Sequence, residues 1–99
     1  MDPLNLKVKI CGIRNLEDAL VAAEAGADFI GMVFVPGRHR RITPKEAKVI
    51  VEGVRNSSGP KPRIVGLFAD QAIEEVAAIV DFCRLDFAQL CGKESVEYA

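Results

Sequence analysis

The stretch KVKICGIRNLEDALVAAEAGAD, residues 7–28, changes from a strand-like pattern to a helical one within a few residues. It starts with a short apolar run that ends in a cysteine and a glycine. After Asn15 the apolar residues recur at intervals of three and four, which is typical of an amphipathic helix. Asn15 is a suitable N-cap, and Gly26 can end the helix. Glu17 and Asp18 favour the helix because they place negative charge in its first turn. The stretch therefore predicts one β-α unit.

The same alternation recurs along the rest of the chain. The further apolar runs are FIGMVFV (29–35), RIVGLFA (63–69) and FAQLC (87–91). Helical spacing of apolar residues is found at Leu16, Ala19, Leu20 and Ala23, at Ala47, Ile50, Val51 and Val54, and at Ile73, Val76, Ala77 and Val80. The expected order is β-α-β-α-β-α-β.

Local signals set the expected helix starts. Thr43-Pro44-Lys45-Glu46 is a capping-box sequence with proline at the first helical position. Asp70 or Gln71 is expected to open the third helix. Ser95 is expected to cap a fourth helix, of which only the first residues are present. The segment NSSGPKP (56–62) is a connection within the domain.

Strands that alternate with amphipathic helices predict a parallel sheet with right-handed crossovers. Two architectures fit this pattern: a doubly wound open sheet, or part of a (β/α)8 barrel. Four strands in 99 residues is roughly half of the ~250 residues typical of a complete barrel. We expect one domain, residues 1–99, which holds strands one to four, three helices and the start of a fourth.

Composition and net charge bear on the class of protein and on the partners that it can bind. The chain has 99 residues, a formal net charge of -1, 49% hydrophobic and 27% charged residues, which indicates one soluble globular domain. This charge gives no case for binding to nucleic acid or to a membrane, and the apolar runs are too short to span a bilayer. Cys11, Cys83 and Cys91 form no CxxC pair, so we expect a reducing, cytoplasmic location.

Cys11 lies at the expected carboxyl end of the first strand, where α/β folds bind ligands. Because alternate side chains of a strand share a face, Lys9 and Cys11 lie opposite Val8 and Ile10. If the apolar pair packs against helices, Lys9 and Cys11 face the barrel interior. The ammonium of Lys9 would favour the thiolate, which is the reactive form of cysteine. The alternative is a buried structural cysteine.

A basic loop follows the second strand. The segment PGRHRRITP (36–44) contains Arg38, His39, Arg40 and Arg41. An arginine in this loop can hold a carboxylate or phosphate through two parallel hydrogen bonds. The alternative is a solvated basic loop, and His39 alone is a weak candidate for acid-base work.

Polar residues also end the fourth strand, in QLCGKES (89–95). Gln89 and Cys91 share a strand face, and Gly92 begins the turn. These side chains are expected at the mouth of the fourth strand, although a purely structural role is the alternative.

These stretches together resemble phosphoribosylanthranilate isomerase, the (β/α)8 barrel enzyme of tryptophan biosynthesis. The resembling segments are KICGIRNLEDALVAAEAGAD (9–28), GMVFVPGRHRRITPKEA (31–47), VGLFADQAIEEV (65–76) and QLCGKES (89–95). They occur in order and at the family's spacing, and they cover essentially the whole chain. The resemblance implies the N-terminal half of a (β/α)8 TIM barrel, about four β-α units with parallel strands.

The resemblance also implies a reaction. It is the intramolecular aldose-ketose (Amadori) isomerisation of N-(5-phospho-β-D-ribosyl)anthranilate to 1-(2-carboxyphenylamino)-1-deoxyribulose 5-phosphate. Cys11 would be the general base that takes the proton from C2 of the opened ribose, and Arg40 would hold the anthranilate carboxylate. The remaining candidate substrate-binding residues are Lys9, Gln89 and Cys91. No metal or organic cofactor is implied, because the substrate supplies its own electron sink.

Two residues depart from the family's usual QLHGDES. Cys91 replaces a histidine that lines the site, and Lys93 replaces an aspartate. The resemblance places the general-acid aspartate and the phosphate-binding loops in the second half of the barrel. The chain alone is therefore expected to be inactive, and to self-associate or to need a complementing C-terminal half-barrel.

Two other classes of function remain open from the sequence. One is a non-catalytic half-barrel that serves as an assembly module. The other is a flavodoxin-like binding domain, which would need a phosphate loop or an acidic pocket at its switch point; the sequence offers neither.

Overall fold

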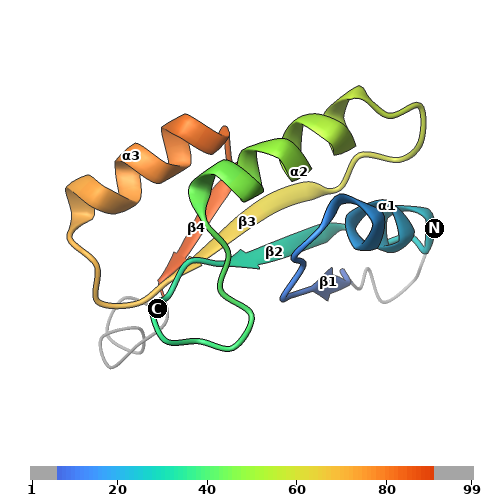
Figure 1. Cartoon of the computed structure of the whole chain (residues 1–99). Coiled ribbons are helices and arrows are strands. Elements are labelled where there is room, and N and C mark those ends of the chain that lie inside the picture. The colour runs from blue at the N-terminus through green and yellow to red at the C-terminus, as the bar shows by residue number, and fades with distance from the viewer. Residues whose placement is uncertain (1–6, 91–99) are drawn as a thin grey trace.

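The computed structural model describes residues 7–90, in which four strands alternate with three helices (Figure 1). The strands are β1 (Lys9–Ile10), β2 (Phe29–Val33), β3 (Arg63–Phe68) and β4 (Phe87–Leu90). The helices are α1 (Leu16–Glu24), α2 (Pro44–Asn56) and α3 (Ile73–Cys83). The predicted order of elements is confirmed over this range. The expected helix start at Ser95 lies outside the described residues.

The four strands form one parallel sheet in the order β1-β2-β3-β4. Helices α1, α2 and α3 all pack on the same face of this sheet (Figure 1). A doubly wound sheet would place helices on both faces and would reverse its strand order. The sequential order and the one-sided helix layer instead match part of a (β/α)8 barrel, which confirms the expected α/β class.

The hydrophobic core lies between the sheet and the helices. Ile30 and Met32 of β2 point into it, as do Ile64 and Phe68 of β3, and each of these side chains has 0% of its surface exposed. The four expected positions of α2 are all buried as predicted: Ala47, Ile50, Val51 and Val54. Successive strand residues alternate between this core and the opposite face of the sheet.

Close packing of α1 on α2 depends on a glycine. A Cβ built on Gly53 would come within 2.6 Å of both methyl carbons of Leu16. Any larger residue at this position would separate the two helices. Glycine usually destabilises the interior of a helix, but at position 53 it allows this close packing.

The expected caps of the first two helices are confirmed. The Asn15 side chain accepts a hydrogen bond of 2.7 Å from the backbone N–H of Asp18. Gly26 follows α1 with a φ of 95°, a conformation that glycine adopts at little cost. Thr43 and Glu46 form the reciprocal capping box. The backbone N–H of Thr43 donates a hydrogen bond to the carboxylate of Glu46, and this bond lowers the pKa of Glu46.

The expected start of α3 is wrong. Helix α3 begins at Ile73, and Ala72 stands at its N-cap without a side-chain hydrogen bond. Gln71 instead accepts a 2.7 Å hydrogen bond from the N–H of Ala69 and donates one of 2.9 Å to the carbonyl of Phe34. The amide therefore ties the β3–α3 loop to the end of β2, and Asp70 caps nothing.

The expected apolar stripe of α3 is only partly correct. Val76 is buried, but Ile73 is 68% exposed and Ala77 is exposed as well. Cys83, which the periodicity did not single out, is buried instead. Within residues 7–90, α3 stands at the end of the helix layer and packs against α2 on one side only. Half of its apolar stripe therefore has no neighbour.

The edge strand β1 also has apolar side chains that lack a covering neighbour among the described residues. Val8 is 52% exposed and Ile10 is 36% exposed, so the condition that this apolar pair packs against helices is not fully met. Both alternate with Lys9, as expected, but no described helix covers them.

No helix within residues 7–90 combines the length and the apolar character needed to cross a bilayer.

Candidate active site

The sheet has a second face that no described helix covers, called here the open face. Its strand residues are Lys9, Phe29, Gly31, Val33, Arg63, Val65, Leu67, Phe87 and Gln89. A hollow of about 470 Å³ lies on this face. Its lining residues come from all four strands and from Lys7, which precedes β1.

Cys11 lies on the open face, directly after β1. A Cβ built on Gly31 of β2 would lie 3.2 Å from the sulfur of Cys11 and 3.0 Å from a methyl carbon of Leu67. The thiol thus occupies the space that a side chain at Gly31 would need. Cys11 is exposed and forms no disulfide. This confirms that Lys9 and Cys11 share a face, and the buried-cysteine alternative is wrong for Cys11.

The buried thiol belongs to Cys83, on the opposite side of the sheet. Its sulfur lies 3.3 Å from the carbonyl oxygen of Pro44, to which the S–H donates. Burial raises the pKa of the Cys83 thiol above its ordinary value. Because the thiolate is the nucleophilic form, this environment makes Cys83 unreactive.

Arg40 packs on the turn that follows β1. Gly12 has a φ of +83°, and a Cβ built on it would come within 2.6 Å of Cδ of Arg40. The Nη1 atom of Arg40 donates a long hydrogen bond of 3.4 Å to the carbonyl of Gly12. Glycine at position 12 therefore serves two needs: it permits the left-handed turn, and it leaves room for the arginine stem. The contact brings a guanidinium to the residue next to Cys11.

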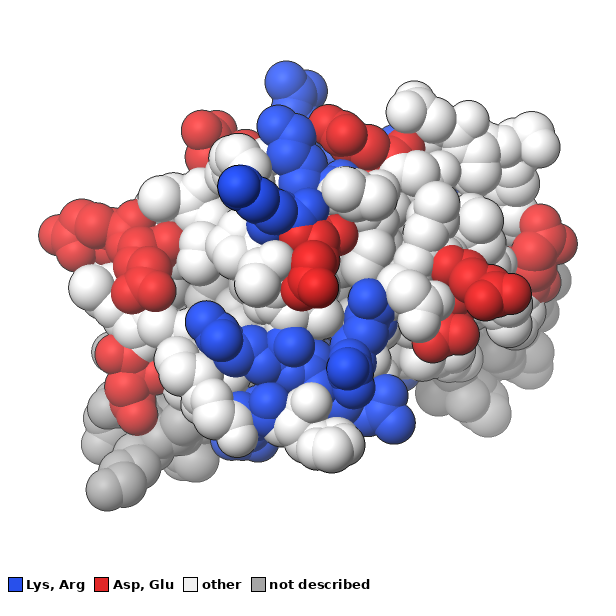
Figure 2. Space-filling view, viewed as in Figure 1, with Lys and Arg blue, Asp and Glu red and all other residues white. Residues whose placement is uncertain are grey.

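The other cations of the basic loop are exposed in the same β2–α2 connection. The loop is held by a hydrogen bond of 3.0 Å from Ile42 N–H to the carbonyl of Val33, and by a bridge that pairs Val33 with Arg41. Basic side chains gather over this connection at the lower centre of Figure 2. Arg38, His39 and Arg41 fit the solvated-loop alternative, whereas Arg40 turns back to β1.

Lys9 and Gln89 meet across the open face. The ammonium of Lys9, on β1, donates a hydrogen bond to the side-chain oxygen of Gln89, on β4. This contact spans the two intervening strands on the face that also carries Val65, which is 5% exposed. Two of the predicted site residues are thereby brought together. Cys91 and Lys93 lie outside the described residues.

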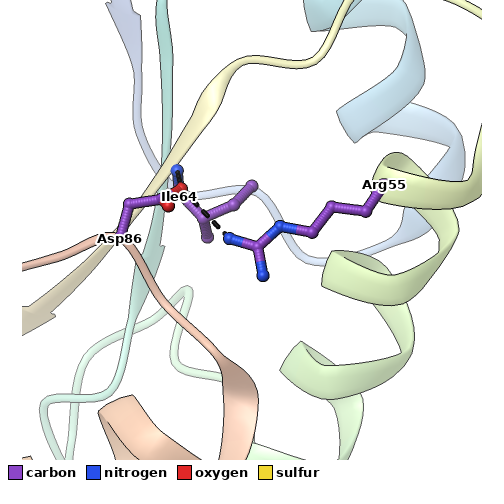
Figure 3. A network of polar contacts seen from close by, with 3 residues as sticks. All are labelled: Arg55, Ile64 and Asp86. Atoms are coloured by element: carbon purple, nitrogen blue, oxygen red, sulfur yellow. Dashed lines mark hydrogen bonds and ion pairs between the residues drawn. The ribbon is translucent and has the colours of Figure 1, made fainter.

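Asp86 lies at the amino end of β4, away from Cys11. Its carboxylate accepts a 2.7 Å hydrogen bond from the N–H of Ile64 and one of 3.1 Å from Arg55 (Figure 3). Asp86 therefore serves the end of the sheet opposite to Cys11. Asp70, in contrast, is exposed in the loop that leaves the carboxyl end of β3, the end at which Cys11 lies.

Within residues 7–90, no three His, Cys, Asp or Glu side chains lie close enough together to hold a metal ion. The functional groups at this site are the exposed thiol of Cys11, the guanidinium of Arg40 beside it, and the ammonium of Lys9, which is hydrogen-bonded to the amide of Gln89.

The family model of N-(5'phosphoribosyl)anthranilate (PRA) isomerase matches residues 8–99. The N-(5'-phosphoribosyl)anthranilate isomerase of Dehalococcoides mccartyi is 47% identical over 93 residues, which cover 94% of this chain and 42% of the relative. The enzyme of the same name from a Roseiflexus species is 43% identical over 97 residues, covering 95% and 45%. The chain thus spans less than half the length of these curated relatives.

Solved structures give the same picture. The phosphoribosyl anthranilate isomerase of Thermus thermophilus superposes with a TM-score of 0.81 at 46% identity, covering 94% of this chain and 44% of that one. An isomerase of this name in complex with reduced 1-(o-carboxyphenylamino)-1-deoxyribulose 5-phosphate gives a TM-score of 0.81 at 39% identity, covering 93% and 45%. The half-sheet with its one-sided helix layer is therefore the arrangement of the matched part of these barrels.

Proposed function

The chain belongs to the N-(5'-phosphoribosyl)anthranilate isomerase family, and we propose that it supplies the base and the carboxylate-binding arginine of an aldose-ketose isomerisation. The substrate would be N-(5-phospho-β-D-ribosyl)anthranilate and the product 1-(2-carboxyphenylamino)-1-deoxyribulose 5-phosphate, a step of tryptophan biosynthesis. The observation that carries the proposal is the position of Cys11: an exposed thiol at the carboxyl end of β1, seated over Gly31, with Arg40 packed on the adjacent Gly12.

The proton transfers assign one task to Cys11. Protonation of the ring oxygen opens the ribose and leaves an iminium at C1. The thiolate of Cys11 then takes the proton from C2. The electron pair of that C–H bond forms the C1–C2 double bond, and the π pair of the C1–N bond moves to nitrogen and neutralises it. The resulting enol-amine becomes the product when C1 gains a proton and the C2 hydroxyl loses one. A thiolate at the carboxyl end of a strand, where barrels of this class bind their ligands, is placed for this proton transfer.

Arg40 would fix the other end of the substrate. Its guanidinium can hold the anthranilate carboxylate through two parallel hydrogen bonds. The stem of Arg40 already packs on Gly12, so little side-chain freedom would be lost on binding. A carboxylate held there would place the rest of the substrate over Cys11.

Lys9 and Gln89 would contact the substrate on the open face, and Cys91 is proposed as a further substrate-binding residue. Their contact across the open face supports this assignment. A solved relative binds a phosphorylated analogue, which supports a phosphorylated small molecule as the ligand here.

We propose that residues 1–99 act as β-α units one to four of a complete barrel. Ring opening needs an acid and the phosphate needs a binding loop, and barrels commonly place the phosphate site after strands seven and eight. The chain alone is expected to be inactive for this reason. Free thiols at Cys11 and Cys83 support a reducing, cytoplasmic setting.

The test is an assay of isomerisation by the chain alone and by the chain co-expressed with the part of the Thermus thermophilus isomerase that it does not match. This two-chain protein is called the assembled barrel below. We expect turnover by the assembled barrel only. Comparable turnover by the chain alone, as a monomer, would show that the acid lies within these residues, with Asp70 as the first candidate to replace by asparagine.

A further inference from the structure

The amide of Gln71 joins two loops at the carboxyl end of the sheet. Its oxygen accepts a hydrogen bond of 2.7 Å from the backbone N–H of Ala69, within the β3–α3 loop. Its nitrogen donates one of 2.9 Å to the carbonyl of Phe34, in the β2–α2 connection. A carboxylate at this position could form only the first of these bonds, because it has no proton to donate.

Phe34 is the first residue of the connection that carries Arg40. Its N–H donates a hydrogen bond of 3.0 Å to the carbonyl of Leu67, and its ring stacks on that of Phe68 with 5.2 Å between the ring centres. The bond from Gln71 occupies its carbonyl. The residue at which the connection leaves the sheet is thus held at its N–H, at its ring and at its carbonyl.

The other contacts of this loop do not fix its direction. The N–H of Ile42 bonds to the carbonyl of Val33 at 3.0 Å, which joins the two ends of the same connection and leaves the closed loop free to tilt as a unit. The bond from the Arg40 guanidinium to the carbonyl of Gly12 is 3.4 Å long, beyond the usual range for such bonds. The direction of the loop therefore depends on how Phe34 is held.

We propose that Gln71 is a positioning residue for Arg40: by holding the carbonyl of Phe34, it fixes the β2–α2 loop in the direction that brings the guanidinium to the turn after β1. This inference rests on the proposed function, in which Arg40 binds the carboxylate of the substrate, and it adds a residue of the next loop to that task. A loop that held Arg40 in place for only about a tenth of the time would bind a carboxylate about tenfold more weakly. Gln71 thus contributes to affinity for a carboxylated ligand through Arg40.

A purely structural role is the alternative. Gln71 precedes Ala72, the N-cap residue of α3, so its replacement could simply loosen that helix. Both hydrogen bonds of the Gln71 amide lead away from α3, however. A loss of stability alone would also not depend on whether a ligand carries a carboxylate. Two ligands that differ only in this group therefore separate the two roles.

The experiment measures the binding of two probes to the assembled barrel. One probe is reduced 1-(o-carboxyphenylamino)-1-deoxyribulose 5-phosphate, the ligand of a solved relative. The other is the same molecule with a phenyl group in place of the carboxyphenyl group. Gln71→Met loses both hydrogen bonds, and Gln71→Glu keeps only the bond from Ala69. Val76→Ala, at a buried position of α3, is the control for lost stability.

We expect both Gln71 variants to weaken binding of the carboxylated probe on the order of tenfold and to leave binding of the phenyl probe unchanged. Arg40→Ala should weaken binding of the carboxylated probe further, and adding Gln71→Met to it should cause no additional loss, because residues that act through one another are not additive. Val76→Ala should lower the midpoint of chemical unfolding and change neither dissociation constant.

Hydrogen exchange on the chain itself needs neither assembly nor turnover. We expect the N–H of Ile42 to exchange faster in Gln71→Met than in wild type, with the N–H of Ile64, at the other end of the sheet, as an unchanged reference.

The proposal is overturned if the exchange of Ile42 is unchanged, or if Gln71→Met weakens both probes equally. A loss that adds fully to that of Arg40→Ala would leave Arg40 as the carboxylate-binding residue and overturn this inference alone. The expected binding pattern without turnover would uphold this inference and contradict the proposed isomerisation alone.

Discussion

The sulfur of Cys11 rests over the bare Cα of Gly31, so that a methyl group at position 31 would lie 3.2 Å from it. Gly31 lies in β2 and Cys11 directly follows the neighbouring strand β1, and the missing side chain at position 31 leaves the space that the thiol occupies on the open face. The position of the proposed base thus depends on a residue that has no side chain of its own.

Gly31→Ala is expected to displace the thiol by a few tenths of an ångström, because Leu67 stands on the other side of the new methyl group. We expect kcat of the assembled barrel to fall on the order of tenfold, since misplacement of a catalytic group is costly even when the fold survives. Steady-state kinetics check this, and circular dichroism controls for folding. An unchanged kcat would separate the position of Cys11 from catalysis.

Arg40→Lys is expected to raise KM nearly as much as Arg40→Ala. Lysine keeps the positive charge but cannot form two parallel hydrogen bonds to a carboxylate. Arg38→Ala, in the same loop, is the control and should change KM little. If both Arg40 variants bind substrate as wild type does, Arg40 is a solvated loop residue like its neighbours.

The capping box predicts a pH dependence of stability. The hydrogen bond from Thr43 lowers the pKa of Glu46 in the folded protein relative to the unfolded chain. The unfolded state therefore binds this proton more readily, so the stabilisation is present above the unfolded pKa of about 4.3 and is lost as pH falls through the lower folded pKa. Urea unfolding at several pH values should show Glu46→Gln less stable than wild type near neutrality and equal to it in acid. A difference that does not vary with pH would contradict this.

The two hydrogen bonds of Asp86 should be separable. Asp86→Ala leaves the N–H of Ile64 without its acceptor and is expected to cost about 1–3 kcal/mol. Asp86→Asn keeps an oxygen for Ile64 and loses only the charge opposite Arg55. That ion pair is partly solvated, with both side chains 35% exposed, so its loss should cost less than about 1 kcal/mol. Chemical unfolding of both variants gives the comparison. Equal costs would assign the stabilisation to the ion pair.

Much of this fold could be predicted from local pattern. The alternation of apolar runs with helical periods, and the caps at Asn15 and Thr43, are properties of short segments and appear in the structure as expected. The start of α3 could not be predicted in this way. Gln71 bonds to the carbonyl of Phe34, which is distant in sequence, and that contact takes the side chain that would otherwise cap the helix.

The candidate site was likewise predictable only where it depends on local pattern. Strand periodicity alone places Lys9 and Cys11 on one face, and the structure agrees. The contact of Arg40 with Gly12 and that of Lys9 with Gln89 both join distant segments, and spacing gives no sign of either. The exposure of Val8, Ile10 and Ile73 could not be predicted from local pattern either, because burial of an edge element depends on neighbours beyond the segment itself.

The most direct test of the account is the effect of Cys11→Ser on isomerisation by the assembled barrel. A hydroxyl is a far weaker base than a thiolate at neutral pH, so we expect kcat to fall by about a thousandfold or more while the complex forms normally and KM changes little. Cys83→Ser, at the buried thiol, is the control and should reduce stability but not kcat per folded molecule. A Cys11→Ser variant that turns over at nearly the wild-type rate would contradict the assignment of Cys11 as the base.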